Sequence, residues 1–192
     1  MRQVTALALM IMLVFAAVSC SGTPGGAEEA ALEIRTELLE AEKLIIGADI
    51  TADYGDRVYE FTVKYTGTAD LGTIAVLAPE TIAGITAEVT QGGCTLVYDG
   101  ARLDMGALTT GGMSPADALP VLVAQWRGGF ITVTGYEKLG ETDTVVLITD
   151  IEDNTQQKTW FDARTHLPVR AELSDGGRLV IACVFNDVVI EK

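Results

Sequence analysis

The chain has 192 residues, and its 27 acidic against 13 basic residues give a formal net charge of −14 at pH 7. This acidity argues against nucleic acid as a partner and against electrostatic adhesion to an anionic lipid surface. The length suits one domain with a substantial core and is too short for two ordinary domains.

The first nineteen residues have the composition of a secretory signal. Arg2 supplies a positive start, and residues 4–18 form an uncharged stretch that is too short for a comfortable membrane span. Cys20 follows directly in a pattern that resembles the bacterial lipobox, although the family form usually has Leu where this chain has Ala17. We therefore predict a lipoprotein signal peptide over residues 1–19, with an ordinary signal peptide and an incidental cysteine as the alternative.

Cys20 is the predicted membrane anchor. The lipobox resemblance implies that its sulfur is acylated and that it begins the mature chain. Each methylene buried in a bilayer contributes about 0.8 kcal/mol, so two or more chains give durable attachment. The glycine-rich stretch after it lacks apolar periodicity, so residues 20–27 are predicted as the lipidated cysteine and a flexible tether. Residues 28–192 then form one domain at the cell membrane, facing outside the cytoplasm.

The domain is predicted to open with a helix and to continue as strands. Residues 28–43 alternate leucine and alanine with acids at helical spacing, which favours one helix or a helix running into a strand. In residues 58–65 apolar and polar side chains alternate, as expected for a strand with one face exposed to solvent. The apolar face of that strand holds Tyr59, Phe61, Val63 and Tyr65.

Short apolar runs separated by turn signals fill most of the remaining chain. Connections this tight join antiparallel neighbours, because a parallel crossover needs a dozen or more residues, so we expect a meander. The further predicted strands are residues 44–53, 71–78, 85–90, 94–98, 130–137, 144–151, 158–161, 167–173 and 178–185.

Residues 114–126, SPADALPVLVAQW, interrupt the strands with a predicted helix. Ser114 can cap it and Pro115 suits its first position. Pro120 removes a backbone hydrogen bond, so we expect an irregular first turn. One face of this helix, at three- and four-residue spacing, holds Leu119, Leu122, Val123 and Trp126.

These elements predict an α+β fold. A long antiparallel sheet has too many strands to stay flat, and its twist makes it curl. One or two helices then pack on the concave face of a half-barrel.

The order of several motifs resembles the LolA/LolB-like half-barrel lipoproteins, and within them the clostridial, spore-germination (GerS-like) type. The resemblance covers roughly residues 40–192. It rests on the capping SPADALP stretch, the strand with Thr159-Trp160-Phe161-Asp162, and the later Ala171-Glu172-Leu173 and Val184-Phe185 runs. It implies a curled sheet around helices, no cofactor, and binding of an acyl chain or a protein instead of catalysis. Because carrier members lack a lipid of their own, the anchored Cys20 favours a receptor or partner-activating role.

The sequence offers little catalytic chemistry, and we predict no enzyme activity, no metal and no cofactor. His166 is the single histidine and lies before a proline, so we expect an exposed turn residue. Residues 150–154 crowd acids at a strand end but lack the calcium-loop pattern, so they are interpreted as a solvated turn. Ser114 lacks the surroundings of a nucleophile, and capping explains it.

Cys94 and Cys183 alternate with apolar residues on strands that look buried. A disulfide requires that the two strands be neighbours, with α-carbons within about 7 Å. A pair of buried free thiols is the favoured interpretation, and a disulfide is the alternative.

One set of aromatic and apolar side chains is a candidate binding site. They could line a groove for a hydrocarbon chain, or they could be the filled core of a small domain. The groove would make the chain a binding module, whereas a filled core favours an accessory subunit that docks a cell-wall enzyme. The candidate groove residues are Tyr59, Phe61, Tyr65, Leu119, Leu122, Val123, Trp126 and Trp160.

Overall fold

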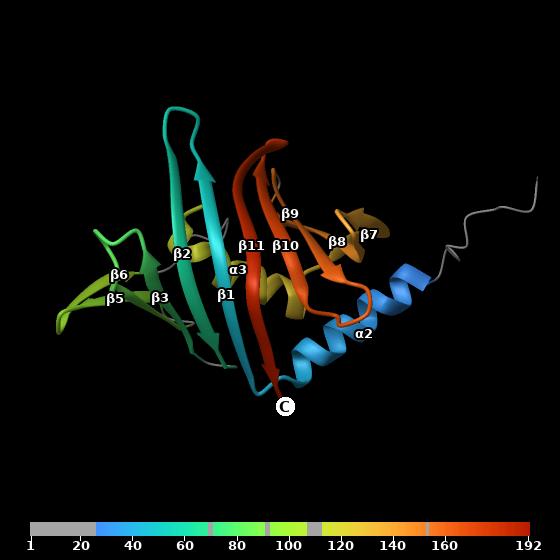
Figure 1. Cartoon of the computed structure of the whole chain (residues 1–192), viewed down its shortest axis with the longest axis horizontal. Coiled ribbons are helices and arrows are strands. Elements are labelled where there is room, and N and C mark those ends of the chain that lie inside the picture. Colours follow the sequence, from blue (N-terminus) through green and yellow to red (C-terminus); the bar gives the residue numbers. More distant parts are fainter. Residues whose placement is uncertain (1–25, 69–70, 91–92, 107–112, 153) are drawn as a thin grey trace, which may run out of the picture.

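The computed structural model describes residues 26–68, 71–90, 93–106, 113–152 and 154–192 (Figure 1). The predicted signal peptide, Cys20 and most of the predicted tether lie outside these residues. The elements are α2 (Gly26–Glu40), β1 (Lys43–Asp53), β2 (Val58–Gly67), β3 (Gly72–Ala78), β4 (Thr86–Thr90), β5 (Gly93–Tyr98), β6 (Ala101–Gly106), α3 (Pro115–Gly128), β7 (Ile131–Leu139), β8 (Thr142–Glu152), β9 (Thr155–Asp162), β10 (Pro168–Asp175) and β11 (Arg178–Glu191).

All eleven strands form one antiparallel sheet with the order β6-β5-β4-β3-β2-β1-β11-β10-β9-β8-β7. The predicted antiparallel half-barrel is confirmed, but the sheet consists of two meanders instead of one. The first and last strands, β1 and β11, pair at the centre and join the two halves. The edge strand β6 was not predicted from the sequence.

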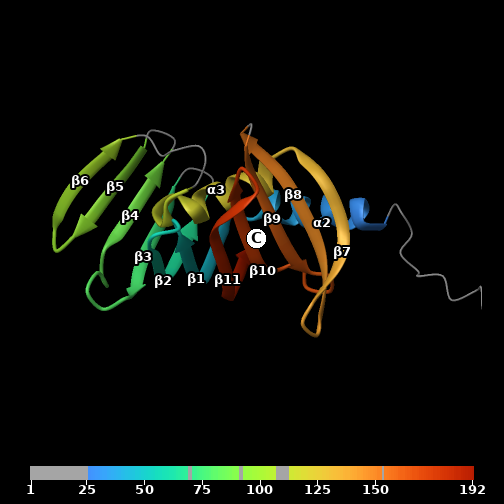
Figure 2. The same ribbon diagram turned by 90° about the horizontal axis from the view of Figure 1, so that it is seen from above.

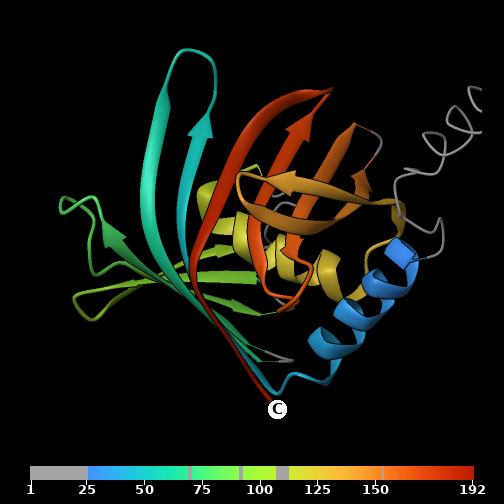
Figure 3. The same cartoon turned by 45° about the vertical axis from the view of Figure 1, so that its right-hand side comes forward.

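Helix α3 lies across the concave side of the curled sheet (Figure 2). Its position follows from the strand order, because β6 and β7 occupy opposite edges and the chain between them must cross the sheet. A helix rises about 1.5 Å per residue, so the 14 residues of α3 span about 21 Å of that crossing. Helix α2 packs near α3, β7 and β8 at the other end of the concave face (Figure 3).

The core lies between α3 and the inward side chains of the sheet. In β1, alternate residues from Leu44 to Ala52 are buried, as a strand with one wet face requires. From α3, Leu119, Leu122 and Trp126 are at most 2 % exposed. The middle of the half-barrel is therefore filled by side chains of the helix.

Trp126 fixes α3 against the C-terminal half of the sheet. Its ring lies 5.6 Å from the rings of both Phe161 and Phe185, in edge-to-face geometry. Its indole Nε1 donates a 2.9 Å hydrogen bond to the Thr159 hydroxyl, which also accepts a 3.1 Å bond from Gln157 Nε2. The helix is thus oriented by a buried polar contact as well as by packing.

The N-terminus of α3 has the predicted cap. Ser114 Oγ accepts a 3.3 Å hydrogen bond from the backbone N–H of Asp117, and Pro115 occupies the first turn. The expected irregular first turn is not found. The helix continues through Pro120, which lacks the N–H that would bond to the Ala116 carbonyl, so the helix loses one hydrogen bond there.

Two arginines cap the C-terminal ends of the two helices reciprocally. Arg35 of α2 donates from Nε to the Trp126 carbonyl at 3.2 Å and from Nη2 to the Gly129 carbonyl at 2.6 Å. Arg127 of α3 donates from Nε to the Leu38 carbonyl at 3.0 Å and from Nη2 to the Ala41 carbonyl at 3.4 Å. Each cation compensates the partial negative charge of the other helix's C-terminus.

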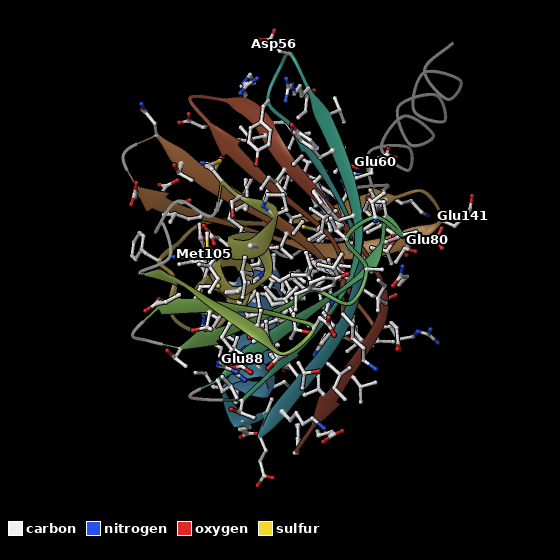
Figure 4. The ribbon with its side chains drawn as sticks, turned by 90° about the vertical axis from the view of Figure 1, so that its left-hand side faces the viewer. Asp56, Glu60, Glu80, Glu88, Met105 and Glu141 are labelled. Carbon is white, nitrogen blue, oxygen red and sulfur yellow. The ribbon has the colours of Figure 1, made fainter. Side chains whose placement is uncertain are left out.

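Helix α2 begins at Gly26, so it includes the last two residues of the predicted tether. None of the helices in the described part of the chain combines the length and apolarity that crossing a membrane requires. Acidic side chains lie around the outside of the molecule, with Asp56 at the tip of the β1–β2 hairpin and Glu141 at the β7–β8 turn (Figure 4). They explain how a chain with a large net negative charge still packs an apolar interior.

Candidate functional site

An apolar cavity of about 250 Å³ lies between the N-terminal end of α3 and strands β2 to β5. We call it the apolar lobe. Except for Ser114, its lining side chains are apolar: Phe61, Val63, Ile74, Val76, Ile82, Ile85, Ala87, Leu96, Pro115 and Ala116. Such a lining cannot satisfy a polar ligand, but it can remove a hydrocarbon from water.

A second cavity of about 270 Å³ lies further along α3, beside its C-terminal half. We call it the polar lobe, because Tyr65 and Arg127 contribute polar atoms to it. Its remaining lining residues are Thr68, Leu71, Gly72, Val89, Thr90, Pro120, Val123 and Ala124. It therefore combines apolar walls with a cation, and no carboxylate is among its described lining residues.

The two lobes follow one another along the same side of α3. On β2, the apolar lobe takes Phe61 and Val63, and the polar lobe takes the next inward residue, Tyr65. On β3 the succession runs from Ile74 to Gly72, and β4 and α3 show the same order. The two lobes thus lie in succession between α3 and the N-terminal half of the sheet, and we call them together the groove.

Two glycines on β2 and β3 make room for the Tyr65 ring at the polar lobe. Gly67 and Gly72 face each other across these strands, and a Cβ built at Gly72 would lie 3.0 Å from the Tyr65 ring. A Cβ at Gly67 would also meet that ring. The two glycines accommodate the Tyr65 ring against the sheet, as aromatic side chains cover glycines in other sheets.

The predicted groove residues separate into three groups. Phe61, Tyr65 and Val123 line the lobes, although Tyr65 and Val123 also belong to the buried core, whereas Leu119, Leu122 and Trp126 lie in the core alone. The structure divides these side chains between the lobes and the core, and their role in binding a ligand stays a prediction. The filled-core alternative describes α3's buried face, and the groove lies beside it.

Tyr59 lies at the rim of the apolar lobe and lines neither cavity. It is 40 % exposed, and its ring stacks on Phe61 at 6.4 Å between centroids. Tyr54 contacts Tyr59 edge to face at 6.1 Å, and the Tyr54 hydroxyl donates a 2.7 Å hydrogen bond to the Met113 carbonyl. Burial raises the pKa of Tyr54, so this donor stays protonated at neutral pH.

Trp160 was predicted to line the groove, but its side chain lies on the opposite face of the sheet. Its neighbours Thr159 and Phe161 contact Trp126 on the concave side, and successive side chains of a strand point to opposite faces. Trp160 accordingly donates from Nε1 to Glu137 at 2.8 Å and has Lys158 Nζ 4.4 Å from its ring centre. It is 6 % exposed because charged neighbours cover it, so it cannot line the groove.

The other candidate residues serve the fold. His166 was expected to be exposed, but its Nδ1 lies 3.1 Å from Glu37 Oε1, which joins the β9–β10 turn to α2. Cys94 and Cys183 are free and buried, and four strands separate β5 from β11. In the described part of the chain, no three His, Cys, Asp or Glu side chains gather as a metal site would require.

Sequence reasoning missed the groove walls that come from β3, β4 and β5. Ile74, Val76 and Leu96 lie in runs that were predicted as strands, but their facing could not be assigned without the pairing of those strands. The inward alternation of Ile74 and Val76 was the available signal, because it continues the pattern of Phe61 and Val63 across one strand pair.

Comparison with known proteins finds likeness in structure and none in sequence. No protein-family model and no curated protein matches the chain. An uncharacterized conserved protein from Thermus thermophilus matches with a TM-score of 0.53 and 11 % identity, over 86 % of this chain and 88 % of that one. A putative outer membrane lipoprotein-sorting protein domain from Vibrio parahaemolyticus matches with a TM-score of 0.51 and 12 % identity, over 87 % and 94 %.

A complex of an amidase with a lipoprotein is also among the similar structures. The complex of the CwlD amidase with the GerS lipoprotein from Clostridioides difficile matches with a TM-score of 0.38 and 15 % identity, over 91 % of this chain and 96 % of that one. This score is too low to support a functional argument. The lipoprotein-sorting relative, together with the curled eleven-stranded sheet and its crossing helix, shows that the chain has the LolA-like half-barrel fold.

Proposed function

We propose that the protein is a non-catalytic lipoprotein of the cell envelope that binds one hydrocarbon chain in the groove between α3 and strands β2 to β5. The apolar lobe carries this proposal. It is a cavity of about 250 Å³ whose lining offers one hydroxyl and otherwise only apolar side chains. An acyl chain is the ligand chemistry that such a surface selects, because hydrocarbon gains by leaving water and requires no hydrogen bond.

The volume favours a single chain. At about 30 Å³ per water-sized group, 250 Å³ accommodates roughly eight methylenes, and the polar lobe adds a similar number. Burying eight methylenes at about 0.8 kcal/mol each contributes about 6 kcal/mol, before the cost of immobilising the ligand. The filled centre of the half-barrel argues against several chains at once, since Leu119 and Leu122 are fully buried there.

The anchor proposal concerns Cys20. The six residue steps from Cys20 to Gly26, where α2 begins, reach at most about 20 Å when extended. An acylated Cys20 would therefore hold the N-terminal end of α2 close to the membrane surface. Labelling with an alkyne analogue of palmitate should mark the wild-type protein and leave Cys20→Ser unmarked. Equal labelling of both would contradict the anchor.

A matched pair of variants tests the groove. Ala116 lines the apolar lobe, so Ala116→Trp should fill it, whereas Ala101 is exposed on the edge strand β6 and offers a control in Ala101→Trp. Native mass spectrometry of the chain from Ser21 onward should detect a bound lipid on the wild type and on Ala101→Trp. Ala116→Trp should lose it. A ligand-free mass for the wild type after incubation with membrane lipids would contradict the proposal.

A second candidate is an accessory subunit that docks a cell-wall enzyme, and the open sheet edge favours it. All six residues of β6 are exposed, and an unpaired edge can add a strand from a partner. Leu103→Pro would block strand addition at this edge without entering the groove. A partner that co-purifies with the wild type and is lost from Leu103→Pro would support this candidate, and a partner retained by the variant would contradict it.

A further inference from the structure

Arg127 is a cation in the groove that forms no ion pair with any carboxylate of the described residues. Its guanidinium donates to three carbonyl oxygens, those of Leu38, Ala41 and Thr68, at 3.0, 3.4 and 3.3 Å. Carbonyl oxygens carry only a partial negative charge, so they position the guanidinium without supplying the full anionic partner that a carboxylate would be. Among the described residues, no carboxylate forms an ion pair with Arg127, although the chain has twice as many acids as bases.

The same guanidinium keeps donor capacity. Arginine has five N–H donors in a fixed planar arrangement, and the three carbonyl contacts use one donor each. Two donors have no acceptor among the described residues, which is the number that a carboxylate or phosphate group takes from one arginine. Arg127 lines the polar lobe, so these donors are close to any ligand that enters it.

Tyr65 supplies a second donor beside Arg127. Its hydroxyl forms no hydrogen bond with any of the described residues, although the side chain is only 4 % exposed. Burial raises the pKa of Tyr65 and Arg127 acts in the opposite direction, with a net rise. The phenol therefore stays protonated at neutral pH and available to an acceptor.

We propose that Arg127 and Tyr65 bind the anionic head of a single-chain amphiphile whose tail occupies the apolar lobe. This inference rests on the proposed acyl-chain function and names its ligand class: one hydrocarbon chain bearing a carboxylate or a phosphate. The order of the lobes along α3 matches the order of tail and head in such a molecule. The overall negative charge opposes the ligand only weakly, since screening at physiological salt acts over about 8 Å.

Arg35 provides a matched control for Arg127. It also caps a helix C-terminus through two backbone carbonyls, but it lines neither lobe. Loss of a cap affects Arg35→Gln and Arg127→Gln alike, whereas loss of head-group binding affects only Arg127→Gln. Tyr65→Phe keeps the ring over Gly67 and Gly72 and removes only the hydroxyl.

The test compares ligands that differ in the head alone. Decanoic acid, decyl phosphate and decanol, whose chains suit the volume of the apolar lobe, are titrated calorimetrically at pH 8, below their aggregation concentrations, into the chain from Ser21 onward. We expect at least one anionic ligand to bind about tenfold more tightly than the alcohol, and the tighter of the two identifies the head. Arg127→Gln should abolish this preference and Tyr65→Phe should reduce it, while Arg35→Gln keeps it.

The ratio of the affinities for the anionic ligand and the alcohol is the decisive quantity. A partly destabilised variant would lower its affinity for both ligands and leave this ratio unchanged. Equal affinity for the anionic ligands and the alcohol in the wild type would overturn the head-group assignment and leave the groove intact. A preference that survives in Arg127→Gln would overturn it as well. If none of the three ligands binds, the proposed acyl-chain function itself fails.

Discussion

The Thr159 hydroxyl is the polar contact that orients α3 on the sheet, and Thr159→Val removes it without changing the shape of the side chain. Thr159 has no exposed surface, and its hydroxyl accepts from both Trp126 Nε1 and Gln157 Nε2. The valine leaves both donors buried without their acceptor. Valine also suits a strand, so the backbone of β9 should be unaffected.

The expected cost follows from these two donors. A buried donor that loses its partner costs about 1–3 kcal/mol, so Thr159→Val should lower the free energy of unfolding by roughly 2–4 kcal/mol, allowing for relaxation. Thr149→Val is the control, because Thr149 is buried on the neighbouring strand β8 and its hydroxyl contacts no described polar group. It should stay within about 1 kcal/mol of the wild type.

Urea unfolding followed by tryptophan fluorescence measures both variants. With a slope of about 2 kcal/mol per molar, the midpoint for Thr159→Val should fall by about 1–2 M at an unchanged slope. The midpoint for Thr149→Val should move by less than about 0.5 M. Equal shifts for the two valine variants would refute the role of Thr159 as a shared acceptor and reduce it to a buried methyl group.

Three further predictions concern the groove wall, the thiols and acid stability. Phe61→Asp should leave the domain folded by circular dichroism and remove lipid binding, whereas Leu122→Asp should unfold it, since only Leu122 lies in the filled core. Burial raises the pKa of Cys183 to about 12, so Cys183 should not react with Ellman's reagent at pH 8 until guanidinium unfolds the chain; a native reaction would contradict its burial. Hydrogen bonds from Lys158 and Trp160 lower the pKa of Glu137, so its stabilisation is complete above the unfolded pKa of about 4.3 and is lost as pH falls through the folded value. The stability gap between wild type and Glu137→Gln should therefore close in acid, and a gap that persists at pH 2 would count against this ion pair.

The strands with one wet face were predictable because local alternation reports burial. Val58–Gly67 shows this most clearly, since Val63 and Tyr65 are buried while Lys64 is exposed. Strand β6 was missed although Ala101, Leu103 and Met105 alternate with polar residues, because so short a run gives a weak signal. Leu103 and Met105 are 60 % and 55 % exposed, so alternation alone does not establish that the apolar face of a strand is buried.

The orientation of the Trp160 side chain could not be predicted from the sequence for a different reason. Thr159, Trp160 and Phe161 are consecutive and all buried, so the strand had to place large rings on both faces. Only the position of α3, through Trp126, identifies Phe161 as the inward ring. Trp160 is instead covered by Lys158, Arg170 and Glu137, which come from three different strands. Contacts of this kind depend on strand pairing that the local sequence does not contain.

The groove itself follows from an asymmetry in the size of the side chains on α3. Trp126 fills the space toward β9 and β11, where it meets Phe161 and Phe185. The side of α3 that lines the two lobes toward β2 to β5 presents mainly small residues, among them Ala116 and Ala124. Unequal side chains on the two sides of the helix leave space beside the small ones. The volume available to a ligand is therefore encoded on the helix that crosses the sheet.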